Sequence, residues 1–500
     1  MKAVHIAGVG MTPFGKSRST LVELLREAAA RALLNSKIHE VDAIYIAAMN
    51  PEEFTGESNL ASHVAEALEL TGIPALRVET ASSAGAAALQ AAFQGVASGY
   101  YRHVLVIGGE KMTHLSTSAT TRILAKVIDA QERQCGATMP ALAAMITERY
   151  RRKYHISQAR LERILCRVAM KNHANGSHNP YAQFREPISH SKYISSKLIA
   201  TPLRLYDCSP ISDGAAATVL TAERTNVVIS GIGQGTGPVS LRARSTFTCF
   251  PATQIAARKA YEMAALSPRD IDFAEVHDAF TPFEMIGTED LGFFAPGKGG
   301  DAIEAGTTAV DGDFPVNASG GLKSRGHPVG ASGLAQIVEA VKILRGDAQF
   351  KFKREPRRAL THSIGGFATN NFVTIIERAD ESVRVQNPWK SIFSSESLHR
   401  QRRRKNADGR IAAEGEIETF TILYTTPDGF LPPLPLALIR DRRGMRMLAQ
   451  GEDTQQLKIG RAVYLRQVAG TYYFTVKSHF QTVREALKQL LRSGRHRRKT

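Results

Sequence analysis

The sequence has little of several features that mark particular classes of protein. Its 500 residues include only four cysteines and one tryptophan, and no two cysteines form a Cys-x-x-Cys pair. This argues against a disulfide framework and a cysteine zinc site. No apolar run reaches the ~18 residues that a membrane-spanning helix needs, and the N-terminus enters a strand-like pattern instead of a signal peptide. We therefore expect a soluble, cytoplasmic protein with reduced cysteines, no metal and no membrane span.

The net charge of +17 is concentrated toward the C-terminus. From residue 381 onward, 23 Lys and Arg stand against 11 Asp and Glu, and this surplus of 12 leaves only 5 for the first 380 residues. Basic runs at 400–405 and 492–499 supply much of the surplus. Neither run has the interleaved aromatic residues of a single-strand-binding surface, so we interpret them as solvated and do not expect nucleic acid as a partner.

Strand and helix patterns alternate over the first 380 residues. In the first half, strands are predicted at 4–8, 43–47, 76–78 and 104–107, and helices at 20–34, 57–70 and 83–98. In the second half, strands are predicted at 227–232, 273–276, 359–362 and 372–376, and helices at 253–265, from 282, and at 331–344. The alternation predicts an α/β fold with a mostly parallel sheet covered on both faces. Its repetition indicates a duplicated fold whose loops meet between the halves.

Two regions depart from this plan. Residues 110–205 form an insertion, with helices at 139–154 and 158–172 followed by a loop at 172–181, and an insertion of this size typically caps a site. Beyond residue 414, short alternating strands separated by turns are typical of a small β-barrel. The predicted domains are 1–225 (first half with insertion 110–205), 226–380 (second half), 381–414 (linker), 415–482 (barrel) and 483–500 (basic tail).

The stretch 78–89 is where we first expect chemistry. A buried strand turns there into an Ala-rich run typical of a tightly packed helix, and Ser82 lies at the junction. The unpaired N–H groups and the positive end of the dipole at a helix N-terminus favour a developing anion beside Ser82. The alternative is that Ser82 and Ser83 are only helix N-caps.

Three further loops carry polar residues where strands end. They contain His277, His327 in a Gly-rich turn at 317–333, and Ser363 before a tight glycine turn. Each loop alone has a structural interpretation, since glycines make tight turns and a histidine can bond to backbone. Together with Ser82 they form a candidate catalytic constellation, because ligands of open α/β folds bind at the carboxyl ends of strands.

Several motifs in order along the chain resemble the thiolase superfamily, in particular its sterol-carrier-protein-type and archaeal acetyl-CoA acetyltransferase-like branch. Beside the 78–89 stretch these are Gly109-Glu-Lys-Met-Thr113, Asn179-Pro-Tyr-Ala-Gln-Phe184, Asp207-Cys-Ser-Pro-Ile-Ser-Asp-Gly214, His277-Asp-Ala-Phe280, Glu289-Asp-Leu-Gly-Phe293 and Gly320-Gly-Leu-Lys-Ser-Arg-Gly-His-Pro328. The resemblance covers residues 1 to about 380. It implies a five-layered αβαβα fold, a homodimer or homotetramer, a coenzyme A thioester as substrate and no permanently bound cofactor.

The resemblance also implies catalytic roles, and the sequence departs from two of them. His327 would activate the nucleophile and His277 would serve a second oxyanion site. Ser82 stands where active relatives have the acyl-accepting cysteine, and Ser363 and Ala279 stand at the two alternative positions of the proton-transfer cysteine. A thiol ionises near pH ~8.5 and a hydroxyl several units higher, at about 1.36 kcal/mol per unit, whereas a helix terminus supplies at most ~2 kcal/mol. Ser82 would therefore need His327 as a general base.

None of the four cysteines is expected to replace the missing nucleophile. Cys166 lies in an apolar helical pattern and Cys208 in a segment resembling a structural turn, while Cys135 and Cys249 are near loops that could approach the site. The C-terminal barrel resembles the OB-fold domain that accompanies thiolase-like proteins, without its cysteine zinc ribbon.

Three functions stay open on the sequence alone. The first is an acyl-CoA-processing enzyme that uses Ser82, by acyl transfer or by carbon–carbon bond cleavage or formation. The second is a non-catalytic acyl-CoA-binding or scaffold subunit. The third is an ordinary acetyl-CoA C-acyltransferase.

Overall fold

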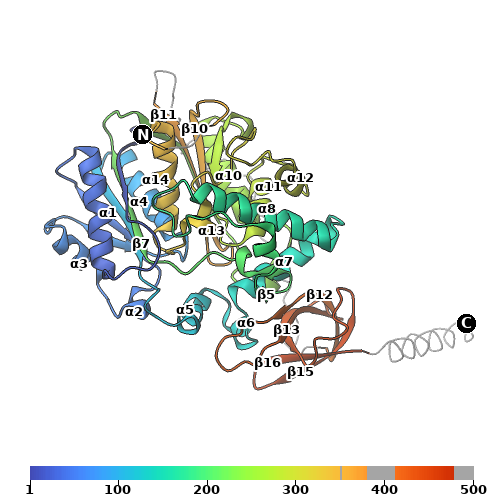
Figure 1. The fold of residues 1–500 in the computed structure, drawn as a ribbon. Helices are drawn as coiled ribbons and strands as arrows, with labels where there is room; N and C mark the ends of the chain where they lie inside the picture. Colours follow the sequence, from blue (N-terminus) through green and yellow to red (C-terminus); the bar gives the residue numbers. More distant parts are fainter. Residues whose placement is uncertain (349–351, 380–411, 478–500) are drawn as a thin grey trace, which may run out of the picture.

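The computed structural model describes residues 1–348, 352–379 and 412–477 (Figure 1). The predicted linker, apart from residues 412–414, and the predicted basic tail lie outside these ranges. Within the described residues no helix combines the length and the apolar character needed to cross a membrane.

Nine strands form one sheet, in the order β3-β2-β4-β7-β1-β8-β11-β10-β9. Their bounds are β1 (His5–Met11), β2 (Ala43–Ala47), β3 (Ala75–Val78), β4 (His103–Glu110), β7 (Gly214–Thr221), β8 (Val227–Thr236), β9 (Phe273–Glu275), β10 (Arg358–Gly365) and β11 (Asn370–Arg378). The pair His5 and Val228 joins the strands of the first half to those of the second.

The prediction of a mostly parallel sheet is wrong. Only the pairs β3–β2, β2–β4 and β9–β10 are parallel, and the other five are antiparallel. The turn between β10 and β11 is too short for a crossover, so these two strands can only pair antiparallel. β7 returns from the insertion and pairs antiparallel with both β4 and β1.

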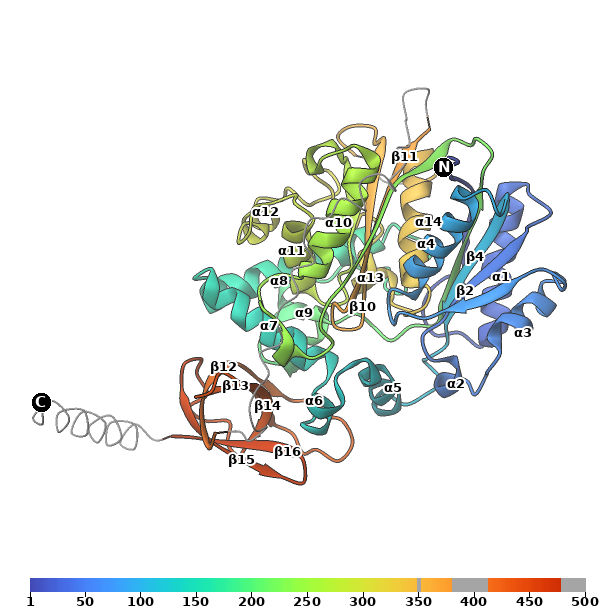
Figure 2. The same ribbon diagram turned by 180° about the vertical axis from the view of Figure 1, so that it is seen from behind.

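The first-half strands and the second-half strands of this sheet form two layers, and the helices supply the other three (Figures 1 and 2). Helices α1 (Leu21–Ser36) and α3 (Leu60–Ala67) cover the first half, and α10 (Pro251–Ala264) covers the second. Helices α4 (Ala84–Ala97) and α14 (Ser332–Arg345) lie between the halves and pack against each other. Their backbones approach so closely that a Cβ on Gly85 would lie 2.9 Å from the Leu334 nitrogen. The five-layered αβαβα expectation is confirmed.

Local sequence signals explain where α1 begins. Thr20 Oγ1 accepts a hydrogen bond from the Glu23 backbone at 3.2 Å, and the Glu23 carboxylate accepts one from the Thr20 backbone at 2.7 Å. This reciprocal capping box satisfies two donors that the helix itself cannot pair. The remaining helices of the two halves are α2 (Pro51–Phe54), α11 (Thr281–Asp290), α12 (Gly299–Glu304) and α13 (Gly321–Arg325).

The insertion folds into helices and two short strands beside the core. Its elements are α5 (Thr117–Leu124), α6 (Ala130–Gln134), α7 (Met139–Lys153), α8 (Gln158–Gly176), α9 (His190–Ile194), β5 (Leu198–Ala200) and β6 (Leu203–Arg204). The predicted loop at 172–181 is wrong in its first half, because α8 continues to Gly176. Asn172 and Asn175 remain helical because their side chains bond elsewhere, to Asp278 at 2.7 Å and to the Asn317 carbonyl at 2.9 Å.

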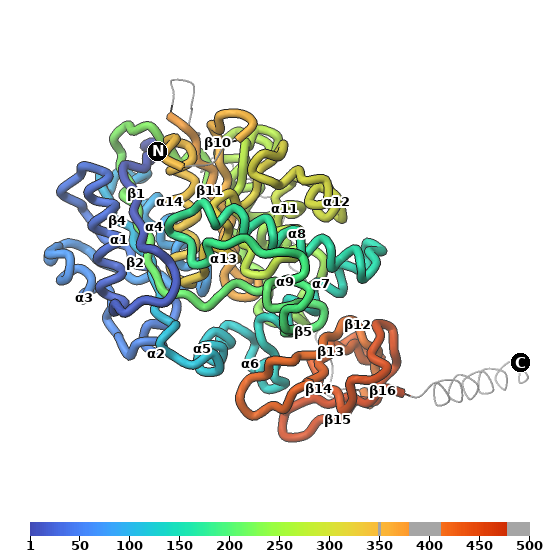
Figure 3. Tube along the Cα trace, viewed as in Figure 1, coloured from blue at the N-terminus to red at the C-terminus, as the bar shows by residue number. Residues whose placement is uncertain are grey.

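The predicted C-terminal barrel is confirmed as a closed five-stranded barrel (Figure 3). Its strands are β12 (Glu414–Leu423), β13 (Leu434–Asp441), β14 (Arg446–Gly451), β15 (Ala462–Val468) and β16 (Thr471–Val476), which close in the order β12-β13-β14-β16-β15-β12. The barrel is continuous with the insertion, since β12 also pairs with β5 at Leu423 and Ala200.

Candidate active site

One pocket brings together three of the four residues singled out in the sequence. Ser82, His277 and His327 line a cavity of about 180 Å³ between the two halves and the insertion. Most of the other lining side chains are apolar, among them Met49, Met112, Leu124, Met139, Phe280, Phe283 and Val329. Because Met112, Leu124 and Met139 belong to the insertion, the insertion closes one side of the pocket, as its length predicted.

A strained turn presents Ser82 to the pocket. The preceding residue, Ala81, has a φ of +56°, and its backbone nitrogen donates to Glu79 Oε1 at 2.5 Å. A left-handed conformation costs an ordinary residue about 1–2 kcal/mol. Ser83, not Ser82, occupies the N-cap position of α4, and the Ser83 hydroxyl bonds to the Thr80 carbonyl at 2.8 Å. The turn thus leaves the Ser82 hydroxyl outside the capping contacts of α4.

We assign the proton of the neutral His327 ring to Nδ1. His327 Nδ1 lies 2.6 Å from Ser332 Oγ, and Ser332 Oγ lies 2.9 Å from the Pro328 carbonyl oxygen. With the single hydroxyl hydrogen of Ser332 directed at that carbonyl, the Ser332 oxygen accepts from Nδ1–H, and in this tautomer Nε2 keeps its lone pair. Burial, with a smaller contribution from Arg325, lowers the pKa of His327 to about 3. His327 is therefore a neutral imidazole whose Nε2 can accept a proton.

His277 lies beside His327 with its ring nearly perpendicular. The ring centroids are 5.2 Å apart at an interplanar angle of 87°. His277 Nδ1 is buried and has no hydrogen-bond partner among the described residues. Burial holds the pKa of His277 well below its ordinary value, and the charges of His327, His362 and Arg325 act in the same direction. The pocket therefore contains two neutral imidazoles, which can bond to substrate and move protons.

A buried carboxylate holds the two histidine loops together. Asp278, next to His277, accepts hydrogen bonds from the Leu322 backbone at 2.6 Å and from Asn172 Nδ2 at 2.7 Å. A Cβ on Gly321 would lie 2.4 Å from Asp278 Oδ2, so only glycine allows this approach. The Gly320-Gly321 pair that precedes His327 in the chain thus lets the two loops meet.

Ser363 does not line the pocket. It lies on β10 with its hydroxyl buried and without a hydrogen-bond partner among the described residues, 3.1 Å from where a Cβ on Gly333 would stand. Its neighbour Gly366 does line the pocket, as does Ala279. The catalytic role of Ser363 stays a prediction.

Sequence reasoning missed Cys208 as a pocket residue. Cys208 lines the same cavity as Ser82, although its segment was interpreted as a structural turn. Burial, and then the charge of Asp207, raises the pKa of Cys208 to about 12, so its thiol is protonated and weakly nucleophilic. Cys135 and Cys249 do not line the pocket, and Cys135 bonds instead to the Leu448 carbonyl of the barrel at 3.1 Å. All four cysteines are free, as expected.

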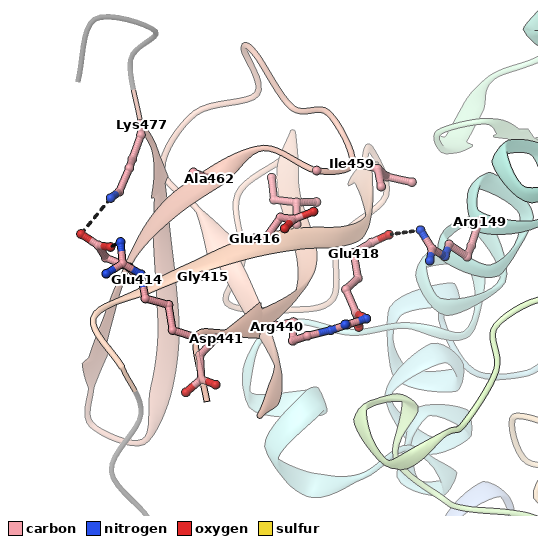
Figure 4. Close-up of a pocket in the computed structure, with 13 residues that line it drawn as sticks. Arg149, Glu414, Gly415, Glu416, Glu418, Arg440, Asp441, Ile459, Ala462 and Lys477 are labelled. Atoms are coloured by element: carbon pink, nitrogen blue, oxygen red, sulfur yellow. Dashed lines mark hydrogen bonds and ion pairs between the residues drawn. The ribbon is translucent and has the colours of Figure 1, made fainter. Parts of the chain in front are cut away.

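The barrel has a separate pocket of about 440 Å³ that faces α7 (Figure 4). Its charged groups bond to one another: Glu418 pairs with Arg440 and, at 2.6 Å, with Arg446, and Lys477 pairs with Glu414 at 2.8 Å. Arg149 of α7 donates to the Glu418 carbonyl at 3.4 Å. These contacts stabilise the barrel and its junction with the insertion. In the described ranges no group of three or more metal-ligating side chains is gathered in one place.

Two family models match the chain. Residues 4–224 match the thiolase N-terminal domain, and residues 233–378 match the thiolase C-terminal domain-like family. An acetyl-CoA acetyltransferase of Methanothermobacter thermautotrophicus is 39% identical over 388 residues, which are 76% of this chain and 100% of the relative. The benzoylsuccinyl-CoA thiolase subunit BbsB of Thauera aromatica is 33% identical over 378 residues, which are 73% of this chain and 95% of that subunit.

Solved structures share the fold. An Ltp2–ChsH2(DUF35) aldolase structure matches 76% of this chain and 99% of its own with a TM-score of 0.62 and 26% identity. A monomeric SCP2-thiolase-like protein type 1 from Mycobacterium smegmatis matches 95% of this chain and 99% of its own with a TM-score of 0.74 and 18% identity. At 18% identity the second match concerns the fold alone.

Proposed function

Because this chain belongs to the thiolase superfamily, we propose that it makes or breaks a carbon–carbon bond in coenzyme A thioesters without forming an acyl-enzyme. The observation that carries the proposal is the hydrogen-bonded chain of His327, Ser332 and the Pro328 carbonyl, which fits an unprotonated Nε2 on a neutral ring in the pocket. The pocket offers a general base, while Ser82 supplies a hydroxyl where an acyl-accepting thiol would be needed. No permanently bound cofactor is required for this chemistry.

The reaction that fits these groups is aldol cleavage or its reverse. His327 Nε2 takes the proton from the β-hydroxyl of a 3-hydroxyacyl thioester, the β-carbon becomes a carbonyl, and the electron pair of the broken Cα–Cβ bond moves into a thioester enolate. The proton on His327 then returns to Cα, so the step balances without an oxidant or a reductant. In this proposal the Ser82 hydroxyl and the neutral His277 ring donate hydrogen bonds to the enolate oxygen.

Acyl transfer through Ser82 is the second candidate. It is favoured by the 39% identity to a protein named acetyl-CoA acetyltransferase over that protein's whole length. In this scheme His327 Nε2 removes the Ser82 proton during attack on the thioester carbonyl, coenzyme A leaves as the thiol, and the acyl group remains on the serine oxygen. An oxygen ester returns its acyl group to coenzyme A less readily than a thioester, which makes reversible thiolysis inefficient.

We extend the proposal to a homo-oligomer. Strand β3 is an edge strand of the nine-stranded sheet, and its Leu76 is 56% exposed. An exposed edge strand with an apolar side chain is a template for pairing with another chain, and a second copy of this chain fits it.

The activity is tested by incubating the protein with 3-hydroxyacyl-CoA alone and with 3-oxoacyl-CoA plus coenzyme A, and by separating the products. We expect cleavage of the 3-hydroxyacyl thioester into a shorter acyl-CoA and a carbonyl compound. His327→Gln should lower this rate by about 10²–10⁴-fold, the usual contribution of a positioned general base. His39→Gln, on the exposed surface, is the matched control. If neither thioester is consumed, the proposal is wrong and the non-catalytic scaffold function remains.

A further inference from the structure

A second cavity adjoins the catalytic pocket. It has a volume of about 930 Å³ and lies among the end of α8, the segment 183–188, α9 and the residues after β6. Cys208, Ser209 and Pro210 line both this cavity and the catalytic pocket, so they form the wall between the two. The catalytic scheme uses none of the side chains that line this second cavity beyond the shared wall.

Lys323 lines this cavity without a counter-ion. The residue is only 2% exposed, and no hydrogen bond or ion pair connects its ammonium group to another described residue. The Phe184 and Tyr206 rings lie near it, with centroids 5.9 and 5.7 Å from Nζ. A buried ammonium without a counter-ion is unfavourable. The Lys323 side chain is therefore a candidate group for binding an anion.

The two buried carboxyls whose charges act on Lys323 are hydrogen-bonded to other groups. Asp207 accepts hydrogen bonds from the hydroxyls of Tyr193 and Thr281, and Asp278 accepts from Asn172 and the Leu322 backbone. They influence Lys323 only at longer range. Burial still dominates and lowers the pKa of Lys323 to about 8, which keeps most of the amine charged at pH 7.

His173 also lines this cavity, and its ring is neutral. The residue is 2% exposed, and its Nδ1 lies 3.4 Å from the Glu186 carbonyl, which can only accept. Nδ1 therefore carries the hydrogen, and Nε2, which is buried and without a partner, keeps a lone pair. Burial, assisted by the charge of Lys323, lowers the pKa of His173 to about 3, so the ring stays neutral.

The walls and the rim of the cavity indicate the chemistry of a ligand for Lys323. Phe184, Tyr206 and Leu205 supply aromatic and aliphatic surface, while Arg185 and Lys192 are exposed at the rim beside a single acidic residue, Glu186. The single buried ammonium matches the single negative charge of a carboxylate, and the apolar walls match an organic body.

We propose that this cavity binds an organic carboxylate with an apolar body, with the Lys323 ammonium as its counter-ion. The carboxylate belongs either to a free acid or to the far end of the acyl group of a thioester whose reacting end lies beyond the shared wall. The proposal does not depend on which reaction the catalytic pocket performs.

Calorimetric titration with benzoate tests the proposal, with benzamide as the neutral compound of the same shape. We expect benzoate to bind the full-length protein at least about tenfold more tightly than benzamide, since a tenfold change corresponds to about 1.4 kcal/mol. Lys323→Met, which keeps the length of the side chain and removes its charge, should abolish this preference. Lys16→Met, at an exposed lysine that does not line the cavity, is the matched control and should keep it. Equal binding of benzoate and benzamide to the wild-type protein, or an unchanged benzoate affinity in Lys323→Met, would overturn the proposal.

A second measurement keeps the test decisive if Lys323→Met does not fold. Limited acetylation of wild-type lysines, followed by peptide mass spectrometry, should show that benzoate protects Lys323 and leaves Lys16 reactive. Lys323 acetylation that is indifferent to saturating benzoate would count against the site.

The source of the carboxylate is resolved by competition. Displacement of benzoate by succinyl-CoA, with no displacement by butyryl-CoA, assigns the site to the carboxylate of an acyl group. If neither thioester displaces benzoate, the site takes a free acid. Equal displacement by both thioesters would contradict a carboxylate site, because butyryl-CoA has no carboxylate on its acyl group.

Discussion

Ser332 determines which nitrogen of His327 can take a proton. Its hydroxyl hydrogen is used by the Pro328 carbonyl, and its oxygen receives the Nδ1–H of His327. The residue itself does not line the catalytic pocket, so it acts on the reaction only by orienting His327. Nothing in the local sequence marked Ser332, which lies five residues after His327 in the first turn of α14.

Replacing Ser332 with alanine tests this positioning role. We expect Ser332→Ala to lower kcat by about tenfold or more with little change in KM, because His327 can then adopt either neutral tautomer. Ser332→Thr, which keeps the hydroxyl, should recover most of the rate. Ser230→Ala, at another buried serine, is the control. A wild-type rate in Ser332→Ala would contradict the role.

Glu110 makes stability depend on pH. Its Oε2 accepts hydrogen bonds from the backbones of Met49 and Gly330 at 2.9 and 3.1 Å, and burial raises its pKa to about 7. A carboxyl whose folded-state pKa is raised contributes stability below its unfolded value of about 4.5, and this contribution is lost as the pH rises to about 7.

We therefore expect Glu110→Gln to flatten the pH dependence of stability. In denaturant titrations from pH 5 to 8, the free energy of unfolding of the wild type should fall relative to that of Glu110→Gln, because only the wild type must ionise a buried carboxyl. Glu52→Gln, at a partly exposed glutamate, is the comparison. A difference between wild type and Glu110→Gln that is constant with pH would show that the pKa of Glu110 is not raised in the folded state within this range.

At the scale of elements, the turn from β3 into α4 is strained so that Ser82 faces the pocket. Ala81 holds the left-handed conformation that glycine adopts without cost. Ala81→Gly should change the free energy of unfolding by less than about 1 kcal/mol, since relief of strain offsets the lost methyl group. Ala88→Gly, equally buried inside α4, should cost about 1 kcal/mol more than Ala81→Gly. Urea unfolding measures both variants, and an equal loss in the two would mean that Ala81 is not strained.

Elements with strong local signals were predicted well. The bounds of β2 agree with the strand predicted at 43–47, and α1 begins directly after the Thr20 cap. The direction of the strands was not predictable in the same way. An alternation of strands and helices does not show whether a connection leads to a parallel strand or, as at β7, to an antiparallel one. The end of α8 was missed because the side chains of Asn172 and Asn175 find partners more than 100 residues away.

The candidate site shows the same difference between residues with a local sequence signal and residues whose role depends on distant contacts. Ser82, His277 and His327 were found because each follows a strand and lies in a distinctive glycine-rich or small-residue context. Cys208 and Ser332 were missed because their importance comes from packing and hydrogen bonds across the fold, for which the chain around them carries no periodic signal. The strand-end argument applied equally to Ser363, yet its side chain faces α14 and not the pocket.

At the scale of the whole molecule, the barrel and the catalytic halves share one apolar core. Leu436, Leu438 and Leu448 of the barrel pack in the same cluster as Phe280 and Phe283, which line the catalytic pocket. The Thr419 hydroxyl also donates to the Met145 carbonyl of α7 at 2.7 Å. The structure therefore predicts that the barrel and the two halves unfold together.

Leu438→Ala tests this coupling. The leucine is fully buried, so its truncation should cost about 2–5 kcal/mol. In calorimetry we expect one transition that moves as a whole to lower temperature, with Leu431→Ala, at an 88% exposed leucine of the barrel, close to wild type. A barrel transition that separates from an unchanged main transition would contradict the coupling.

The central claim is that this thiolase-family pocket works without an acyl-enzyme, and intact-protein mass after incubation with acetyl-CoA tests it most directly. The account predicts that the wild-type protein keeps its mass while it cleaves a 3-hydroxyacyl thioester, and that Ser82→Cys gains the mass of one acetyl group. An acetyl adduct on the wild-type protein that is absent from Ser82→Ala would contradict the claim and establish acyl transfer through Ser82.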